Sequence, residues 1–224
     1  PMTREQSSDL EWCGHVPVAT RFDDPNFSLE NGLAETRHVF LEGNGLPARF
    51  ASGFAIAEIG FGTGLNLCAA IAAWKASGQK GQLAFTTFEA YPMLPDSMER
   101  ALSSFPEVAD EAAPVLGALA AGAHGVVTPW LEFRLIPGDA RATLALWEGS
   151  ADAWFLDGFS PAKNPELWEP ELLAEVARHT RPGGRAATYT AAVAVRRALA
   201  EAGFSVDRVP GYGRKRHMSV AYLA

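Results

Sequence analysis

Glu58-Ile59-Gly60-Phe61-Gly62-Thr63-Gly64-Leu65-Asn66 joins an apolar run, residues 55–59, to a segment with helical character. Three glycines at alternate positions allow a tight turn and a close approach of the backbone to a ligand. The spacing differs from the dinucleotide-binding pattern Gly-x-Gly-x-x-Gly, because Leu65 stands where that pattern has its third glycine. The stretch therefore predicts a strand, a ligand-binding loop and a helix, in that order.

Short apolar runs alternate with longer helical segments from residue 54 onward. Strands are expected at 55–59, 83–88, 131–136, 153–156, 185–190, 205–209 and 218–222. Helices are expected at 65–77, 95–102, 111–121, 170–179 and 192–202, with a turn at 182–184. This alternation predicts an α/β fold with a mostly parallel, doubly wound sheet over residues 51–224, in which ligands bind beyond the carboxyl ends of the strands. Residues 1–50 are interpreted as a small N-terminal appendage, a hairpin and a helix packed on the core at the sheet edge.

The composition is that of an ordinary globular protein. The 224 residues are 48% hydrophobic, and the formal net charge is −7. No apolar run reaches the roughly 18 residues of a membrane span, and the two cysteines and five histidines show no metal-ligand spacing. These features predict a soluble, cytoplasmic protein that contacts no membrane and holds no metal.

The charge is unevenly distributed along the chain. From Arg178 to the C-terminus there are nine basic and two acidic residues, a net charge of +7, whereas the remainder has 10 basic and 24 acidic residues, a net charge of −14. An acidic total argues against a nucleic-acid partner, but a basic segment of this kind is one sign of a polyanion-binding face. Solvated helix faces give the same count, so both interpretations stay open at this point.

The pattern Glu-x-Gly-x-Gly-x-Gly is typical of S-adenosylmethionine (SAM) methyltransferases, whose ligand has no pyrophosphate. The predicted cofactor contacts are Glu58, Gly60, Phe61, Gly62, Thr63, Gly64 and Asn66. Glu89 follows the next strand, where it is placed to accept both ribose hydroxyls of a nucleoside. Gly138 and Asp139 follow the third strand and are also predicted cofactor contacts, with Asp139 placed to accept from an adenine amino group. The structural alternatives are an exposed turn cap for Glu89 and a helix N-cap for Asp139.

Asp157 is the predicted catalytic residue, and it is expected to lie against the cofactor as well. A buried apolar strand delivers it into a loop, residues 157–168, that glycine and proline shape. An acidic side chain in such a place is costly unless it is paired or used. Phe159 and Trp168 offer aromatic surface for stacking a base, although Trp168 is more typical of core packing, and Pro161 stiffens the loop.

Several runs of the chain resemble the MnmC-like tRNA methyltransferase family. They are Phe22-Asp23-Asp24, Phe27-Ser28, Asn31-Gly32-Leu33-Ala34-Glu35-Thr36-Arg37, Val39-Phe40-Leu41, residues 58–66, residues 155–168 and Gly213-Arg214-Lys215-Arg216. The resemblance extends over residues 22–218, and the Asp-Gly-Phe-x-Pro-Ala-Lys-Asn-Pro loop is its most specific part.

The resemblance implies a Rossmann-like fold and SAM-dependent methyl transfer to the primary amine of 5-aminomethyl-2-thiouridine at the tRNA wobble position, which gives the 5-methylaminomethyl form. Asp157 then orients the amine and takes its proton, and a base splayed out of the anticodon loop needs its own contacts. The residues expected to bind that base are Phe159, Pro161, Lys163 and Asn164. The residues expected to contact the tRNA backbone are Arg214, Lys215 and Arg216.

Many relatives also carry a flavin-dependent oxidase domain that produces the aminomethyl substrate. The sequence has no second dinucleotide loop, so we expect no FAD in this chain, which is then a stand-alone methyltransferase or a fragment, with the oxidase as a possible partner. Asn26 stands where the family usually has tyrosine, so an aromatic contact there is expected from Phe27. Arg37 is expected either to reach the active site or to form a structural ion pair.

Two other functions are compatible with the same motifs. Methylation of a small-molecule amine fits the acidic total charge and needs only the SAM site. A non-catalytic nucleotide-binding module would keep the glycine loop but would not need the Asp157 loop. A continuous track of arginine and lysine leading to Asp157 favours tRNA over the small amine.

Overall fold

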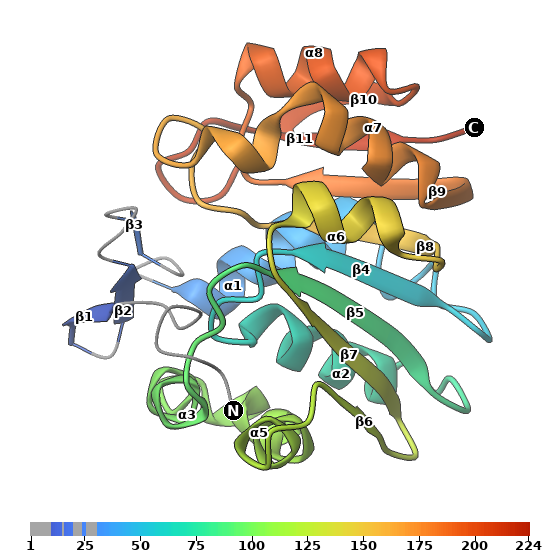
Figure 1. The fold of residues 1–224 in the computed structure, drawn as a ribbon. Coiled ribbons are helices and arrows are strands. Elements are labelled where there is room, and N and C mark those ends of the chain that lie inside the picture. The colour runs from blue at the N-terminus through green and yellow to red at the C-terminus, as the bar shows by residue number, and fades with distance from the viewer. Residues whose placement is uncertain (1–9, 15, 20–23, 26–30) are drawn as a thin grey trace.

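The computed structural model describes residues 10–14, 16–19, 24–25 and 31–224, and its centre is an eight-stranded sheet (Figure 1). The strands are β4 (Ala55–Ile59), β5 (Leu83–Glu89), β6 (Gly125–Val127), β7 (Leu131–Pro137), β8 (Ala151–Leu156), β9 (Thr180–Thr188), β10 (Ser205–Pro210) and β11 (His217–Tyr222). Their order is β10-β11-β9-β8-β4-β5-β7-β6. The five central strands are parallel, and β6, β10 and β11 pair antiparallel. The predicted α/β class with a mostly parallel sheet is therefore confirmed.

Helices cover both faces of the sheet (Figure 1). On one face lie α1 (Gly32–Thr36), η2 (Arg37–Leu41), η3 (Glu42–Asn44), α2 (Leu65–Ala76), α3 (Pro95–Leu102), α4 (Pro106–Ala109), η4 (Asp110–Ala112) and α5 (Ala113–Ala120). On the other lie α6 (Ala140–Leu146), η5 (Pro165–Trp168), α7 (Pro170–Arg178) and α8 (Val193–Glu201). Strands covered on both sides need apolar side chains throughout, which is why β4 is buried at every position.

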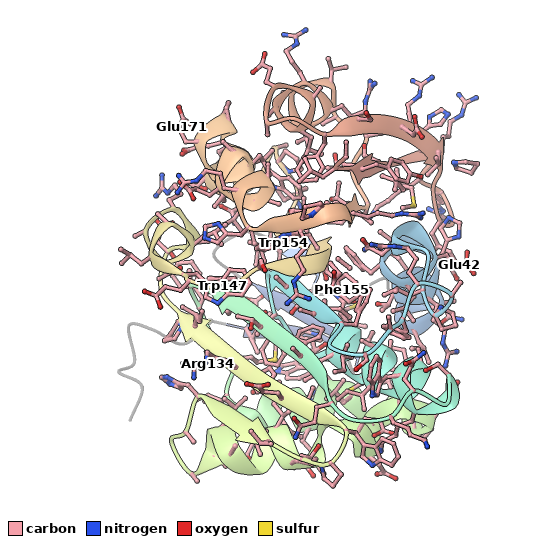
Figure 2. All side chains as sticks on the ribbon, turned by 90° about the vertical axis from the view of Figure 1, so that its right-hand side faces the viewer. Glu42, Arg134, Trp147, Trp154, Phe155 and Glu171 are labelled. Carbon is pink, nitrogen blue, oxygen red and sulfur yellow. The ribbon has the colours of Figure 1, made fainter. Side chains whose placement is uncertain are left out.

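Successive residues of β8 belong to the two opposite cores, because side chains alternate across a strand. Trp154 packs with Phe88 and Trp147, whereas Phe155 packs with Phe40 and Phe85. Figure 2 shows this division, with Trp147 and α7 on one side of the sheet and the helical segment that carries Glu42 on the other. A rigid, doubly packed strand of this kind leads directly into Asp157.

Two strands and one helix differ from the sequence prediction. The expected turn at 182–184 lies inside β9, because Ala151 pairs with Thr180 while Ala153 pairs with Arg185, so the extra residues form a bulge. Neither β6 nor α6 was predicted, since both are short and have no clear hydrophobic period. The closing pair β10 and β11 is confirmed as an antiparallel hairpin.

The N-terminal region contributes two kinds of structure. A small antiparallel sheet of β1 (Leu10–Cys13), β2 (Val16–Ala19) and β3 (Asp24–Pro25) precedes α1. The helical segment 32–44 covers a face of the main sheet rather than its edge, since Val39, Phe40 and Leu41 belong to the same core as α2. Phe22, Asp23, Asn26, Phe27 and Ser28, which contribute to the family resemblance, lie outside the described residues.

None of the helices in the described ranges has the length and apolarity that crossing a membrane requires. Within the same ranges, no group of three or more His, Cys, Asp or Glu side chains is arranged to hold a metal ion. Cys68 is buried in α2, and burial raises the pKa of its thiol to about 12, so this thiol is inert and belongs to the core.

Candidate cofactor and active site

A cavity of about 910 Å³ opens at the carboxyl ends of the parallel strands, the edge where the fold predicts a ligand. Its size is within the range of small-molecule sites. The predicted site residues on its wall are Gly60, Phe61, Gly62, Thr63, Asn66, Glu89, Asp139, Asp157, Phe159, Lys163, Asn164, Arg214 and Lys215. The other predicted residues, all within the described part of the chain, do not line it: Glu58, Gly64, Gly138, Pro161 and Arg216. The fold thus brings together residues from five separate segments.

Gly60 is required by the contact between two loops. Its φ is 92°, and a Cβ at this position would collide with the carbonyl oxygen of Asp157. The Gly60 N–H donates to the Phe88 carbonyl at 3.0 Å, and the Asp157 N–H donates to the Ile59 carbonyl at 2.9 Å. The ends of β4, β5 and β8 are therefore held against one another, which places the glycine loop, Glu89 and Asp157 around one space.

Glu89 is fixed by backbone donors of the loops beside it. Its Oε1 accepts from the Gly62 N–H at 3.1 Å, and its Oε2 accepts from the Tyr91 N–H at 3.3 Å. Burial raises the pKa of Glu89, and these N–H groups partly oppose the shift. The carboxylate also lies on the cavity wall, so acceptance of ribose hydroxyls by Glu89 remains a prediction that its position allows.

Asp139 serves as the N-cap of α6 in this structure. Its Oδ1 accepts from the Arg141 N–H at 2.9 Å, and the Arg141 guanidinium approaches Oδ2 to 2.7 Å. The hydrogen bonds from Arg141 hold the pKa of Asp139 below its usual value. The helix N-cap role expected as the alternative for Asp139 is therefore present. A contact between Asp139 and adenine remains a prediction, and it requires that Arg141 and the adenine share the carboxylate.

Asn66 connects two carboxyl groups through one amide nitrogen. Its Nδ2 donates to Asp157 Oδ2 at 2.8 Å and to Glu58 Oε2 at 2.9 Å. The Asn66 Oδ1 accepts from Thr36 Oγ1 at 2.9 Å, and Thr87 Oγ1 donates to Glu58 Oε1 at 2.8 Å. Because the three hydrogen bonds of the Asn66 amide are made with buried or half-buried groups, they hold the amide in one orientation, and the amide in turn orients Asp157.

Glu58 lies behind Asn66 with none of its surface exposed, so it acts on the site through Asn66. Burial, together with the nearby charge of Asp157, raises the pKa of Glu58 well above its usual value. A direct contact between Glu58 and a cofactor would require the site to rearrange.

Replacing Glu58 with glutamine is expected to raise the free energy of unfolding, and this gain is expected to grow as the pH rises. The folded protein keeps a proton on Glu58 that the unfolded chain releases, so the wild-type free energy of unfolding falls above the ordinary pKa of 4.5. Glutamine is neutral at every pH and retains an oxygen for Asn66. Melting temperatures of both proteins, measured from about pH 4 to about pH 9, check this. A difference that does not change with pH, or one matched by the exposed control Glu42→Gln, contradicts it.

Hydrogen bonds within the loop after β8 support the residues that it places on the cavity wall. The N–H groups of Lys163 and Asn164 donate to the Ser160 carbonyl at 2.9 and 2.8 Å. Trp168 is only 7% exposed and donates from Nε1 to the Phe159 carbonyl at 2.8 Å. The core interpretation of Trp168 is confirmed, and its hydrogen bond supports the backbone at Phe159, which faces the cavity.

The hairpin loop between β10 and β11 closes another side of the cavity. Tyr212, Gly213, Arg214 and Lys215 line it. Arg37 forms an ion pair with Glu107 at 3.6 Å and is not on the cavity wall, so of the two expectations for Arg37 the structural one is confirmed. Not all basic residues of the C-terminal segment, from Arg178 onward, lie on the cavity wall. Arg178 forms an ion pair with Glu175, and Arg181 forms one with Asp152.

Sequence reasoning missed several residues of the cavity wall. They are Glu35, Thr36, Tyr91, Arg141, Tyr189 and Tyr212. Tyr189 directly follows β9, and that position beyond the carboxyl end of a parallel strand was the available signal. Glu35 and Thr36 lie in a run that carries the family resemblance, but no pattern in that run shows which side chains face the cavity.

Residues 113–224 match the family model of the S-adenosyl-L-methionine-dependent methyltransferases, and the chain belongs to this family. It is 46% identical over 229 residues to the tRNA 5-methylaminomethyl-2-thiouridine biosynthesis bifunctional protein MnmC of Caulobacter sp. (strain K31), with 96% of this chain and 38% of that protein covered. It is 42% identical over 238 residues to MnmC of Chromohalobacter salexigens, with 100% of this chain and 34% of that protein covered. The chain thus spans little more than a third of the length of these relatives.

Among solved structures, MNMC2 from Aquifex aeolicus superposes with a TM-score of 0.79 and 25% sequence identity, covering 98% of this chain and 72% of that one. The resemblance to MnmC-like methyltransferases is therefore confirmed. SAM is the cofactor of the family, and the cavity wall fits it. The carboxylates of Glu89 and Asp157 suit hydroxyl groups and a cationic sulfonium, and the Gly60 turn lets the backbone approach closely.

Proposed function

We propose that the chain transfers the methyl group of SAM to the primary amine of 5-aminomethyl-2-thiouridine, or of 5-aminomethyluridine, at the wobble position of tRNA. The observation that carries this proposal is the Asp157 carboxylate, held by Asn66 on the wall of the cavity that also contains the glycine loop and Glu89. The MnmC relatives are named for biosynthesis of the corresponding methylaminomethyl nucleoside, which indicates the amine as the methyl acceptor.

The residues of the site divide the work of the reaction. The bound cofactor supplies an electrophilic methyl group, which only a neutral amine can accept. The Asp157 carboxylate accepts a hydrogen bond from the amine, directs its lone pair and takes its proton. Asn66, fixed by Thr36, prevents Asp157 from turning away. Alignment of the reactants is expected to contribute more than proton transfer, because effective molarities of aligned groups are large.

A wobble base reaches this cavity only when it leaves the anticodon stack. Phe159 on the cavity wall is suited to stack the base, and Lys163 and Asn164 on the same loop are suited to hydrogen-bond its edge. The aminomethyl group itself has to be produced by another activity, for which a flavin-dependent oxidase is the partner we infer. Such a function places the protein in the cytoplasm, where tRNA is modified.

The direct test is a methyl-transfer assay with SAM and tRNA that lacks only the final methyl group. Nucleosides from the digested tRNA are identified by mass spectrometry, and an unmodified tRNA transcript is the matched control. Formation of 5-methylaminomethyl nucleoside in the first tRNA alone supports the proposal. Transfer to small amines but not to this tRNA would instead favour the small-molecule function.

Charge reversal at Arg214 and Arg216 is expected to weaken tRNA binding about tenfold or more and to reduce its salt dependence, because each lost phosphate contact lowers the salt slope by about one unit. Both residues are exposed on the β10–β11 loop, and Arg214 lines the cavity. Binding is measured by filter retention over a range of salt concentrations. Reversal at Arg134 and Arg178, which do not line the cavity, makes the same charge change and is the control. An equal loss in both double variants contradicts a local role.

A further inference from the structure

We propose that Glu35 and Tyr189 form a binding site for the primary ammonium group of the substrate, at the place that the Lys215 ammonium holds in the structure. The inference rests on the proposed function and deepens it, because it says how the aminomethyl group is recognised before it reacts. It assigns new roles to Glu35 and Tyr189 and a second role to Lys215.

The geometry is that of a receptor for an alkylammonium ion. Lys215 Nζ lies 3.7 Å from Glu35 Oε1 and 4.3 Å from the centroid of the Tyr189 ring. A carboxylate combined with the face of an electron-rich ring is a combination that proteins use to bind alkylammonium groups. Glu35, Tyr189 and Lys215 all lie on the wall of the cavity that contains Asp157.

Both halves of this receptor are connected to Asp157. The Tyr189 hydroxyl donates to the carbonyl of Gly158, the residue that follows Asp157, at 2.5 Å. Glu35 precedes Thr36 in α1, and Thr36 holds the Asn66 amide that donates to Asp157. A ligand ammonium between Glu35 and Tyr189 thus lies in the cavity that Asp157 lines.

The orientation of the Tyr189 ring is set by its surroundings. It packs edge-on against Trp168 with ring centroids 6.1 Å apart, and Trp168 in turn donates to the Phe159 carbonyl. Tyr189 itself follows β9, and its ring is held by contacts with Gly158 and Trp168 of the loop that carries Asp157 and Phe159.

Lys215 and the substrate present the same chemical group. A lysine side chain ends in a primary ammonium on a methylene carbon, and a protonated 5-aminomethyl group does so as well. The two have equal charge and equal donors, so a site that binds one binds the other. Lys215 extends from the β10–β11 loop with its side chain about half exposed (49%), so it is able to leave without a change in the fold. Once displaced, its ammonium becomes available to a phosphate of the RNA.

The test compares two anticodon stem-loop RNAs that differ in charge at one group. One carries 5-aminomethyluridine and the other carries the neutral 5-hydroxymethyluridine, and both are titrated with the wild-type protein. We expect the wild type to bind the amine RNA about tenfold more tightly. Glu35→Gln and Tyr189→Leu are expected to bring the ratio of the two affinities close to one. Glu42→Gln, further along the helical segment 32–44 and with a 70% exposed side chain, is expected to keep the wild-type ratio.

A second arm uses the free nucleoside 5-aminomethyluridine, which has no phosphate. Because Lys215 competes for the same place, Lys215→Met is expected to raise the affinity for this nucleoside, whereas Glu35→Gln lowers it. A lower nucleoside affinity in Lys215→Met overturns the competition, and an unchanged RNA ratio in Glu35→Gln overturns the binding site. If the wild type methylates the amine RNA in either of these cases, the proposed function stands without the inference. If the wild type does not methylate the amine RNA at all, both fail.

Discussion

Replacement of Asp157 by asparagine is expected to lower kcat for methyl transfer about a hundredfold or more, while the Kd for SAM changes only a few-fold. Asparagine offers an oxygen to the Asn66 amide in place of Asp157 Oδ2, so the local hydrogen bond is retained. It is unable to accept the proton of the amine, and it lacks the charge that orients an ammonium group. The loss therefore falls on turnover rather than on cofactor binding.

Single-turnover methyl transfer and calorimetric SAM titration separate these two effects. The matched control is Asp207→Asn, which removes an exposed carboxylate from β10, away from the cavity wall. If Asp157→Asn keeps wild-type turnover, the mechanism proposed for this carboxylate is refuted. If SAM binding is lost together with turnover, Asp157 belongs to the cofactor site alone.

Alanine at Gly60 is expected to destabilise the protein by about 3 kcal/mol and to abolish SAM binding. Two costs combine at this position. An alanine with a φ of 92° is strained, and its Cβ has to displace the Asp157 carbonyl. Because Asp157 is hydrogen-bonded to β4 through Ile59, the displacement separates the two loops that form the site.

Chemical denaturation gives the change in the free energy of unfolding, and SAM titration gives the change in binding. Gly81→Ala is the control, because Gly81 has a φ of 81° but nothing within 4 Å of a Cβ. This control carries only the backbone cost, about 1–2 kcal/mol. Equal destabilisation by the two variants would show that the contact with Asp157 is unimportant.

The main strands and helices were predictable because their patterns are local. Residues 55–59 form an apolar run that ends at the glycine loop, and the structure contains β4 over the same residues. The bulge in β9 was not predictable, because Pro182, Gly183 and Gly184 are typical of a turn. Hydrogen bonds of Gly183 and Gly184 with Leu223, and the pairing of Thr180 and Arg185 with β8, keep these residues in the sheet, which is a tertiary effect that overrides local preference.

The candidate site likewise has residues that local patterns predicted and contacts that only tertiary structure revealed. Asp157, Glu89 and the glycine loop were placed by one rule, that polar residues at the carboxyl ends of successive parallel strands converge. The hydrogen bond from Asn66 to Asp157 joins residues 91 positions apart, and Arg141 donates to the Asp139 carboxylate. No local sequence pattern predicts either contact. The sequence also could not show that Glu58 is fully buried behind Asn66, because that burial comes from packing between distant segments.

The residue types along the chain were enough to predict the fold class and to place the glycine loop and the Asp157 carboxylate at the ends of strands, because each depends on short-range periodicity and spacing. The division of the basic C-terminal segment depended on three-dimensional packing. Arg178 and Arg181 pair with nearby carboxylates, whereas Lys215 lies on the cavity wall and approaches Glu35. Net charge sums over the whole chain, but recognition depends on which charges share one cavity, and only the folding of distant segments against one another brings them there.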